Sequence, residues 1–233
     1  MYFKQAVIIL ILAILIFFSI SSFRYSRIWK NSHSMWTHVV KFYPNYSIAY
    51  KSMGYWHAHD KNDYQEALID YNKSIELNNK DFDAFIGRGN VYGLTGKLDL
   101  ALADFTSAMH LDSTKTEAYL NRAITYINLN QYSNALADIN KAICLSSKNT
   151  NFKILKGFIL LNLDKYKECI EDCDEVVSIN NTNPDVYFYE GIAYSQLKNF
   201  DKALSYFTKT LALNKDYPNA EKYRSLVLKE LQK

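Results

Sequence analysis

The sequence predicts an all-α fold, in which repeated pairs of helices stack into a solenoid behind one apolar N-terminal helix. The repeat is visible in small residues that recur every 34 positions, at Ala67, Ala101, Ala135, Cys169 and Ala203. A period of about 20–50 residues is typical of proteins that stack one supersecondary unit. The chain has 233 residues but only 7 Gly and 3 Pro, too few for an all-β or loop-rich fold. An uncharged stretch near the N-terminus predicts the separate apolar helix.

This uncharged stretch, Gln5–Phe23, contains 19 residues. As a helix it would be about 28 Å long, close to the thickness of the hydrocarbon core of a bilayer. A cleaved signal peptide is the alternative. A retained anchor is favoured because the apolar run is long, no small-residue cleavage site follows it, and Arg24 comes directly after it. We therefore expect residues 1–23 to be a transmembrane anchor that contacts the membrane through residues 5–23.

Residues 24–46 are expected to form a basic juxtamembrane segment and a half-repeat helix that caps the solenoid. Trp36 and Val39 lie there at helical spacing, and Pro44 ends the helix. Residues 1–59 carry six Lys or Arg and no acid, whereas the rest of the chain is slightly acidic. The basic charge therefore belongs to the end near the membrane. The repeats lack the basic face of a nucleic-acid-binding surface, so we expect no nucleic-acid partner.

The repeated unit is clearest in Phe82–Lys115, which reads Phe85-x2-Arg88-Gly89-x2-Tyr92 and then Ala101-x3-Phe105. This resembles the pattern of tetratricopeptide repeats (TPR), aromatic-x2-Leu-Gly-x2-Tyr and then Ala-x3-Phe. The resemblance covers about residues 47–217 and implies a right-handed α-solenoid of about five antiparallel helix pairs. The pairs are expected at residues 47–81, 82–115, 116–149, 150–183 and 184–217. A C-terminal capping helix is expected in residues 218–233.

Two departures from the family pattern concern the turns. The first repeat has one extra residue near Lys61–Asn62, which we expect in the turn between its helices. None of the full repeats has the family's closing proline, which leaves the geometry of the turns between repeats open. Charges also recur on the helices, and we interpret them as ion pairs between neighbouring helices. The residues concerned are Arg88, Arg122 and Lys156 on first helices, and Asp70, Asp104, Asp138 and Asp172 on second helices.

The sequence shows no arrangement of residues that indicates catalysis, a cofactor or a metal site. Cys169 and Cys173 share a helix face, but both occupy positions that the repeat buries, and no further ligand completes a site. We therefore expect them to be small core residues. His57 and His59 are two residues apart on a helix and point to different sides, which makes them a poor ligand pair. No enzymatic activity is expected.

In TPR proteins, the first helix of each repeat lines a concave groove. Carried over position by position, the resemblance implies a partner-binding groove lined by Tyr55, Ile86, Asn90, Leu120, Ile124, Ile127, Ile154, Phe158, Leu161, Phe188 and Ile192. Its apolar character is unusual for positions that face solvent and predicts a protein or peptide partner. The alternative is that these side chains only pack first helices against each other. The polar clamp of chaperone-binding members is not present, because Tyr55 and Glu117 stand where it needs Asn and a cation.

These features predict a membrane-anchored TPR scaffold that mediates protein–protein interaction. A second resemblance gives an alternative. The residues from Trp29 to Gly54 resemble the junction between the last membrane helix and the repeats of polytopic, mannosyltransferase-like membrane proteins. The chain would then correspond to the C-terminal TPR tail of a glycosyltransferase-like protein. DNA upstream of Met1 that encodes further hydrophobic helices in frame would favour this alternative.

Charge and resemblance indicate opposite sides of the membrane for the repeats. Arg24, Arg27 and Lys30 outnumber the positive charges before the apolar stretch, which favours cytoplasmic repeats in a single-pass protein. The resemblance to polytopic proteins favours the outer side. If the chain is made from Met1, the charge rule should govern, and we expect the repeats in the cytoplasm. The oligomeric state stays open.

Overall fold

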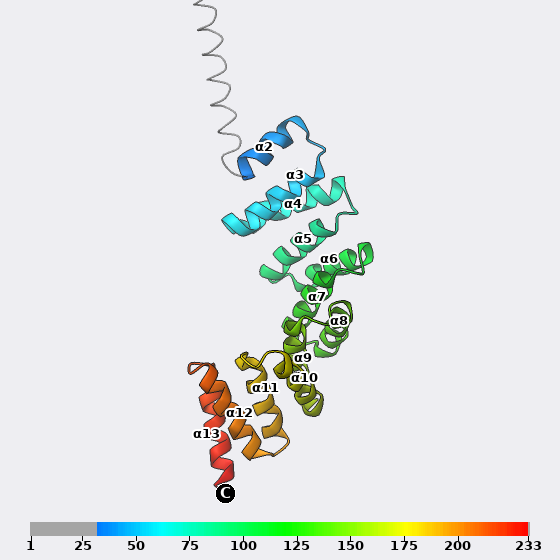
Figure 1. Cartoon of the computed structure of the whole chain (residues 1–233). Coiled ribbons are helices and arrows are strands. Elements are labelled where there is room, and N and C mark those ends of the chain that lie inside the picture. Colours follow the sequence, from blue (N-terminus) through cyan, green and yellow to red (C-terminus); the bar gives the residue numbers. More distant parts are fainter. Residues whose placement is uncertain (1–31, 233) are drawn as a thin grey trace, which may run out of the picture. The chain divides into compact units, whose positions relative to one another are not determined.

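The computed structural model describes residues 32–232, in which every regular element is helical (Figure 1). The chain divides into two compact units, residues 1–111 and 112–233. The first unit contains α2 (Ser32–Phe42), α3 (Ser47–Trp56), the π-helical turn η1 (His57–Lys61), α4 (Tyr64–Leu77), α5 (Phe82–Leu94) and α6 (Leu98–Leu111). The second contains α7 (Thr116–Asn128), α8 (Tyr132–Leu145), α9 (Thr150–Asn162), α10 (Tyr166–Ile179), α11 (Pro184–Gln196), α12 (Phe200–Leu213) and α13 (Ala220–Leu231).

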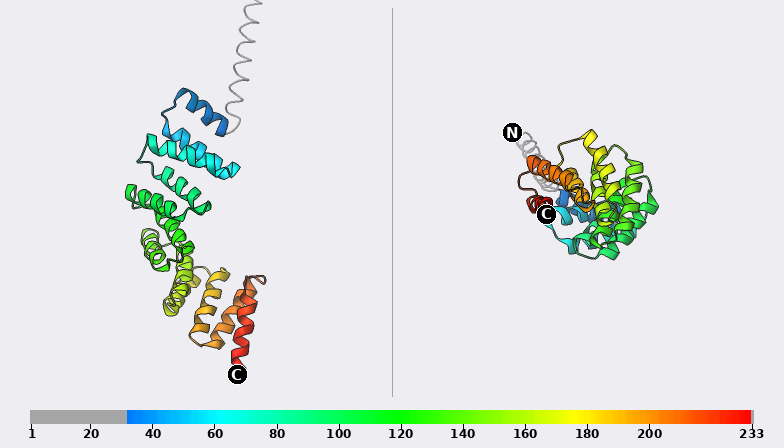
Figure 2. Two further views of the ribbon diagram at one scale, coloured as in Figure 1. Left: turned by 180° about the vertical axis from the view of Figure 1, so that it is seen from behind. Right: turned by 90° about the horizontal axis from the view of Figure 1, so that it is seen from below.

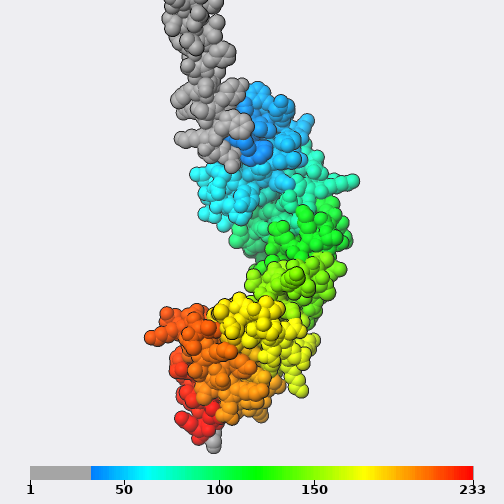
Figure 3. All heavy atoms as spheres, in the orientation of Figure 1, coloured from blue at the N-terminus to red at the C-terminus, as the bar shows by residue number. Residues whose placement is uncertain are grey.

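Within each unit, successive helices pack against each other as antiparallel hairpins (Figure 2). In the space-filling view, the surfaces of successive helices within each unit lie in contact (Figure 3). The predicted all-α solenoid of helix pairs is therefore confirmed. Among residues 32–232 no helix has the length and apolar character needed to cross a bilayer. The expected anchor, residues 1–23, lies outside the described residues, as does most of the basic segment that follows it.

In the first, second and last hairpins a glycine on the first helix meets an aromatic ring on the second helix. A methyl group added at Gly89 of α5 would stand 2.7 Å from the ring of Phe105 on α6. The same relation joins Gly191 of α11 to Phe207 of α12, again at 2.7 Å. Because the rings occupy the space that a Cβ would take, the two helices of a hairpin approach closely. This is the packing that the sequence pattern predicted.

The turns inside the hairpins share a left-handed residue. It lies at the same repeat position in every hairpin, at Asn62, Gly96, Asn130, Asp164 and Lys198, with φ between 54° and 74°. Glycine adopts this conformation freely and Asn or Asp tolerates it, whereas a lysine is strained there. Lys198 is therefore the least suited residue of the five.

The turns between hairpins are closed by side chains in place of the missing proline. The Asn78 side chain accepts a hydrogen bond from the backbone N–H two residues later, at 3.1 Å. Asp112, Asn180 and Asn214 make the same bond at 3.0–3.1 Å. Such Asx turns satisfy local backbone groups without a proline. This answers the question of turn geometry for these four junctions.

The extra residue of the first repeat lies elsewhere than expected. It does not lengthen the turn at Lys61–Asn62 but widens the end of the preceding helix into η1, His57–Lys61. Asn62 keeps the left-handed conformation of the turn residue. A π turn accommodates one additional residue while keeping backbone hydrogen bonds, so the second helix still starts at its usual place.

Candidate partner-binding surface

One partly exposed apolar surface in the second unit lies on α7 and α9. Ile124 is 41% exposed, although it is a large aliphatic residue in the middle of α7. The other predicted groove residues on these two helices are half-buried: Leu120, Ile127, Ile154, Phe158 and Leu161. Each of them therefore has part of its side chain on the protein surface. These six residues are called the α7–α9 surface below.

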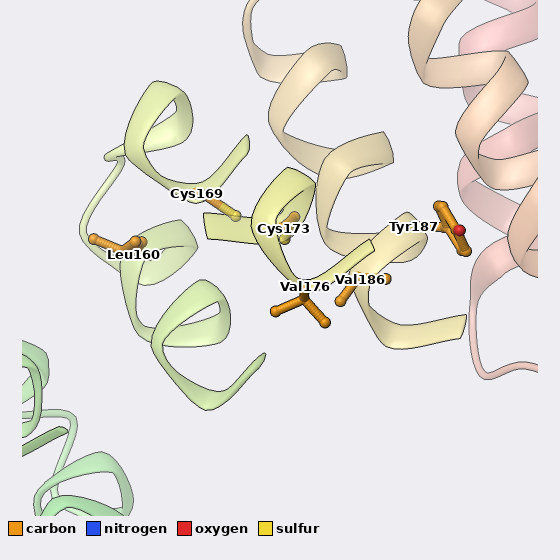
Figure 4. Close-up of a cluster of buried hydrophobic side chains, with 6 residues drawn as sticks. All are labelled: Leu160, Cys169, Cys173, Val176, Val186 and Tyr187. Atoms are coloured by element: carbon orange, nitrogen blue, oxygen red, sulfur yellow. The ribbon is translucent and has the colours of Figure 1, made fainter. Parts of the chain in front are cut away.

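Packing on one side holds the α9 part of this surface in place. Phe158 lies between two tyrosine rings, 6.5 Å from Tyr132 of α8 and 6.4 Å from Tyr189 of α11, measured between ring centroids. Ile154 and Leu161 pack against the buried cluster that Figure 4 shows. That cluster consists of Leu160, Cys169, Cys173, Val176, Val186 and Tyr187.

Two predicted groove residues, Phe188 and Ile192, are used for internal packing. The Phe188 ring lies 4.8 Å from that of Tyr217 and 5.6 Å from that of Tyr223 on α13. Ile192 packs against the cluster formed by Ala203, Phe207 and Val227. The C-terminal helix therefore covers this end of the expected groove. Both residues are half-buried, so part of each still lies at the protein surface.

In the first unit, the expected groove residues differ in exposure. Tyr55 is exposed and its ring lies 4.3 Å from that of His59. Asn90 is half-buried. Ile86 is only 5% exposed, so it belongs to the core and offers a partner no surface. Lys51 lies 2.9 Å from Asp81 and 3.3 Å from Asp83, an ion pair within the unit.

The periodic charges form the predicted ion pairs between the helices of one hairpin. Arg88 lies 2.7 Å from Asp104, Arg122 lies 2.7 Å from Asp138, and Lys156 lies 2.8 Å from Asp172. The hydrogen bond from Arg122 to Asp138 raises the pKa of the guanidinium above its usual value. These pairs are largely buried, so they hold the hairpins together and leave no free charge for a ligand.

The first and last hairpins lack this kind of ion pair between a basic and an acidic residue at the same two positions. Asp70 has no arginine opposite it and instead lies 2.7 Å from Nδ1 of His57. In the last hairpin, Glu190 and Tyr206 stand where the other repeats have the base and the acid. Glu190 is fully buried, and neither of its oxygens has a hydrogen-bond partner of ordinary geometry among the described residues. Burial and the nearby Asp174 of α10 raise the pKa of Glu190 to about 8.

The two cysteines of α10 are buried core residues, as predicted. Both belong to the cluster in Figure 4, where they lie beside Val176. A hydrogen bond to Cys169, together with burial, raises the pKa of the Cys173 thiol well above its usual range. The described residues contain no group of three or more His, Cys, Asp or Glu that could hold a metal ion.

One aromatic and histidine cluster was not predicted. His33 of α2 stacks on Trp56 of α3 with ring centroids 4.0 Å apart, and His57 lies against both rings. Burial, and then His57 and Lys61, lower the pKa of His33 below its ordinary value of 6.5. The cluster fixes α2 to the first hairpin. Its only sequence signal was the unusual histidine content of this region.

The arrangement defines an all-α protein of stacked helix hairpins, and its family follows from sequence matches. The family described as "Tetratricopeptide repeat" matches residues 116–149, 151–183 and 184–217, and that described as "TPR repeat" matches residues 58–96. Together the matches cover more than half of the chain. The chain therefore belongs to the tetratricopeptide-repeat family. No curated protein sequence matches it.

Several solved structures share the fold at low sequence identity. YrrB, described as a TPR protein with an unusual peptide-binding site, has a TM-score of 0.73 and 22% identity over 82% of this chain and 97% of its own. A TPR protein from Parabacteroides merdae has a TM-score of 0.72 and 19% identity over 78% of this chain and 72% of its own. The MamA protein has a TM-score of 0.67 and 21% identity over 76% of this chain and 94% of its own. At these identities the likeness shows the fold alone.

Proposed function

We propose that this protein is a membrane-anchored, non-catalytic scaffold that binds a segment of another protein through the α7–α9 surface. The observation that carries the proposal is the exposed apolar side chain of Ile124, together with five half-buried apolar or aromatic residues on the same two helices. A surface of this kind is costly to leave in water and is typical of interaction sites. An amphipathic helix or an extended segment with aliphatic side chains fits it. YrrB, with the same fold, is described as having a peptide-binding site.

Site-specific photocrosslinking tests the surface in the full chain. A photoreactive phenylalanine analogue at Ile124 should crosslink to a discrete protein partner in cells. The matched control is Ala137, which is exposed on α8 and lies outside the α7–α9 surface. Crosslinking at Ile124 that disappears in Leu120→Asp, with none at Ala137, would support the proposal. Equal crosslinking at both positions, or none at Ile124, would contradict it.

The anchor is part of the proposal and rests on the uncharged stretch Gln5–Phe23. The full chain should remain with membranes during carbonate extraction. Recovery of the intact chain in the soluble fraction would contradict the anchor but would leave the partner-binding surface standing. The two parts of the proposal therefore fail separately.

The repeats are proposed to lie in the cytoplasm, and the structure supplies the probe for this. Cys144 is exposed, whereas Cys169 and Cys173 are buried. A membrane-impermeant maleimide should therefore label Cys144 only after lysis of the cells. Cys144→Ser is the control that shows the labelling is specific. Labelling of intact cells would place the repeats outside and would favour the second candidate, the TPR tail of a polytopic glycosyltransferase-like protein, which rests on the likeness of residues 29–54 to such a junction.

A further inference from the structure

The turn between α2 and α3 exposes several large aromatic side chains in succession. Phe42 is 60% exposed, Tyr43 67% and Tyr46 44%. With Pro44 and Asn45, these residues line an open hollow. Phe42, Tyr43 and Tyr46 are called the aromatic tip below. Three neighbouring aromatic residues with this exposure are more than the scattered apolar residues of an ordinary surface, and they indicate an interaction site.

The aromatic tip is not needed to hold the first unit together. At the start of α2, far from the tip along the helix, His33 stacks on Trp56 of α3. The backbone of the turn is fixed instead by a hydrogen bond from the Tyr50 hydroxyl to the carbonyl of Pro44, at 3.1 Å. The tip is thus a set of apolar side chains on a firmly held turn.

Charge and chain length indicate what the tip contacts. Lys41 precedes it and is exposed, and the chain carries no acid before Asp60. Between Phe23 and Ser32 the chain spans at most about 30 Å, and α2 adds about 16 Å. A bilayer that holds Gln5–Phe23 is therefore within reach of the tip. Aromatic side chains favour the interface between lipid and water, and exposed lysines favour anionic headgroups.

We propose that the aromatic tip lies in the headgroup layer of the membrane and holds the first hairpin against the bilayer. Phe42 and Tyr43 enter the interface, where the tyrosine hydroxyl stays hydrated, and Lys41 lies at the level of the phosphates. The proposal rests on the anchor proposed above, because an isolated patch of three aromatic residues would bind lipid weakly. A protein partner is the competing occupant and is distinguished by the experiment.

Depth-dependent quenching in vesicles tests this placement in the full chain. The chain carries Cys144→Ser, which leaves only buried cysteines, and is reconstituted into phosphatidylcholine vesicles with and without phosphatidylglycerol. A fluorescent label is attached at Tyr43→Cys or, as the control, at Gln65→Cys. Gln65 is exposed on α4 at the opposite end of the first hairpin from the tip. Brominated lipids should quench the label at position 43 several-fold more than that at position 65, and more strongly with the anionic lipid.

A second variant separates the tip from the anchor. Replacing Phe42 and Tyr46 by serine in the chain labelled at position 43 should reduce the quenching while carbonate extraction and the melting temperature stay unchanged. An anchored chain whose label at position 43 is not quenched would overturn the tip proposal and leave the anchor intact. Equal quenching at positions 43 and 65 would overturn it as well. So would shielding of position 43 that appears only when a cell extract is added, since that would identify a protein as the occupant.

Discussion

Gly89 of α5 and Phe105 of α6 lie so close that a methyl group on the glycine would overlap the ring, at 2.7 Å. Phe105 is itself buried and has no room to retreat. We therefore expect Gly89→Ala to lower the free energy of unfolding by about 1–3 kcal/mol, as overpacking does in other cores. Chemical denaturation followed by circular dichroism measures this loss.

Gly93, one turn further along α5, is the matched control. A methyl group there would meet nothing within 4 Å. Gly93→Ala should therefore raise the free energy of unfolding by about 0.5–1 kcal/mol, because alanine is the better helix former. A similar change at both glycines would show that helix propensity, and not the contact with Phe105, decides the outcome.

Glu190 should make the second unit pH-sensitive. Its pKa is about 8 when folded, against an ordinary value of 4.5. Between these values the folded chain keeps a proton that the unfolded chain releases, so the free energy of unfolding falls as pH rises, by at most about 1.4 kcal/mol per pH unit. Glu190→Gln should flatten this dependence in melting curves recorded from pH 5 to about 9. Glu171→Gln, an exposed change on α10, should leave the slope intact.

Asp138 should be far more important for stability than a surface acid. It is buried and paired with Arg122 at 2.7 Å, so Asp138→Asn leaves a guanidinium without its charge partner. We expect a loss of about 3–5 kcal/mol. Glu76→Gln breaks the exposed pair with Lys73 and should cost less than about 1 kcal/mol. Comparable losses for the two variants would contradict a structural role for the buried pairs.

Lys198 occupies the left-handed position of the last hairpin turn, with φ of 60°. Lys198→Gly should relieve the conformational strain and raise the free energy of unfolding by about 1 kcal/mol. Asn130→Gly, at the same place in another hairpin, should gain less because asparagine tolerates this conformation. An equal or larger gain at Asn130 would show that residue type at this turn is unimportant.

The helix hairpins could be predicted from the sequence because one packing relation recurs with a fixed period. The contacts between Gly89 and Phe105, and between Gly191 and Phe207, correspond to a regular spacing of residue types along the chain. The ion pairs were predictable for the same reason. Where the period is broken, as by Glu190 in place of a base, the sequence shows the change but does not show that the carboxyl group is buried.

The candidate surface was less predictable, because its exposure depends on neighbouring helices. Ile86 and Leu120 occupy the same repeat position on first helices, yet Ile86 is buried and Leu120 is half-buried. Phe188 has the repeat position of a groove residue, yet Tyr217 and Tyr223 cover it at the C-terminal end of the array. A family pattern assigns a side chain to a helix face, whereas the local packing decides how much of that face meets solvent.

The π-helical turn His57–Lys61 has a consequence for how such arrays change in length. The π-helical turn accommodates the single inserted residue within about one turn of helix. Asn62 and the residues after it therefore keep their positions in the repeat. Evolution, or a protein engineer, can therefore alter residue number at this site without rebuilding a repeat. The same insertion in the middle of α4 would rotate Tyr71 away from Gly54, and the close packing of the two helices of the first hairpin would be lost. The end of a first helix is thus where this architecture tolerates insertions and deletions.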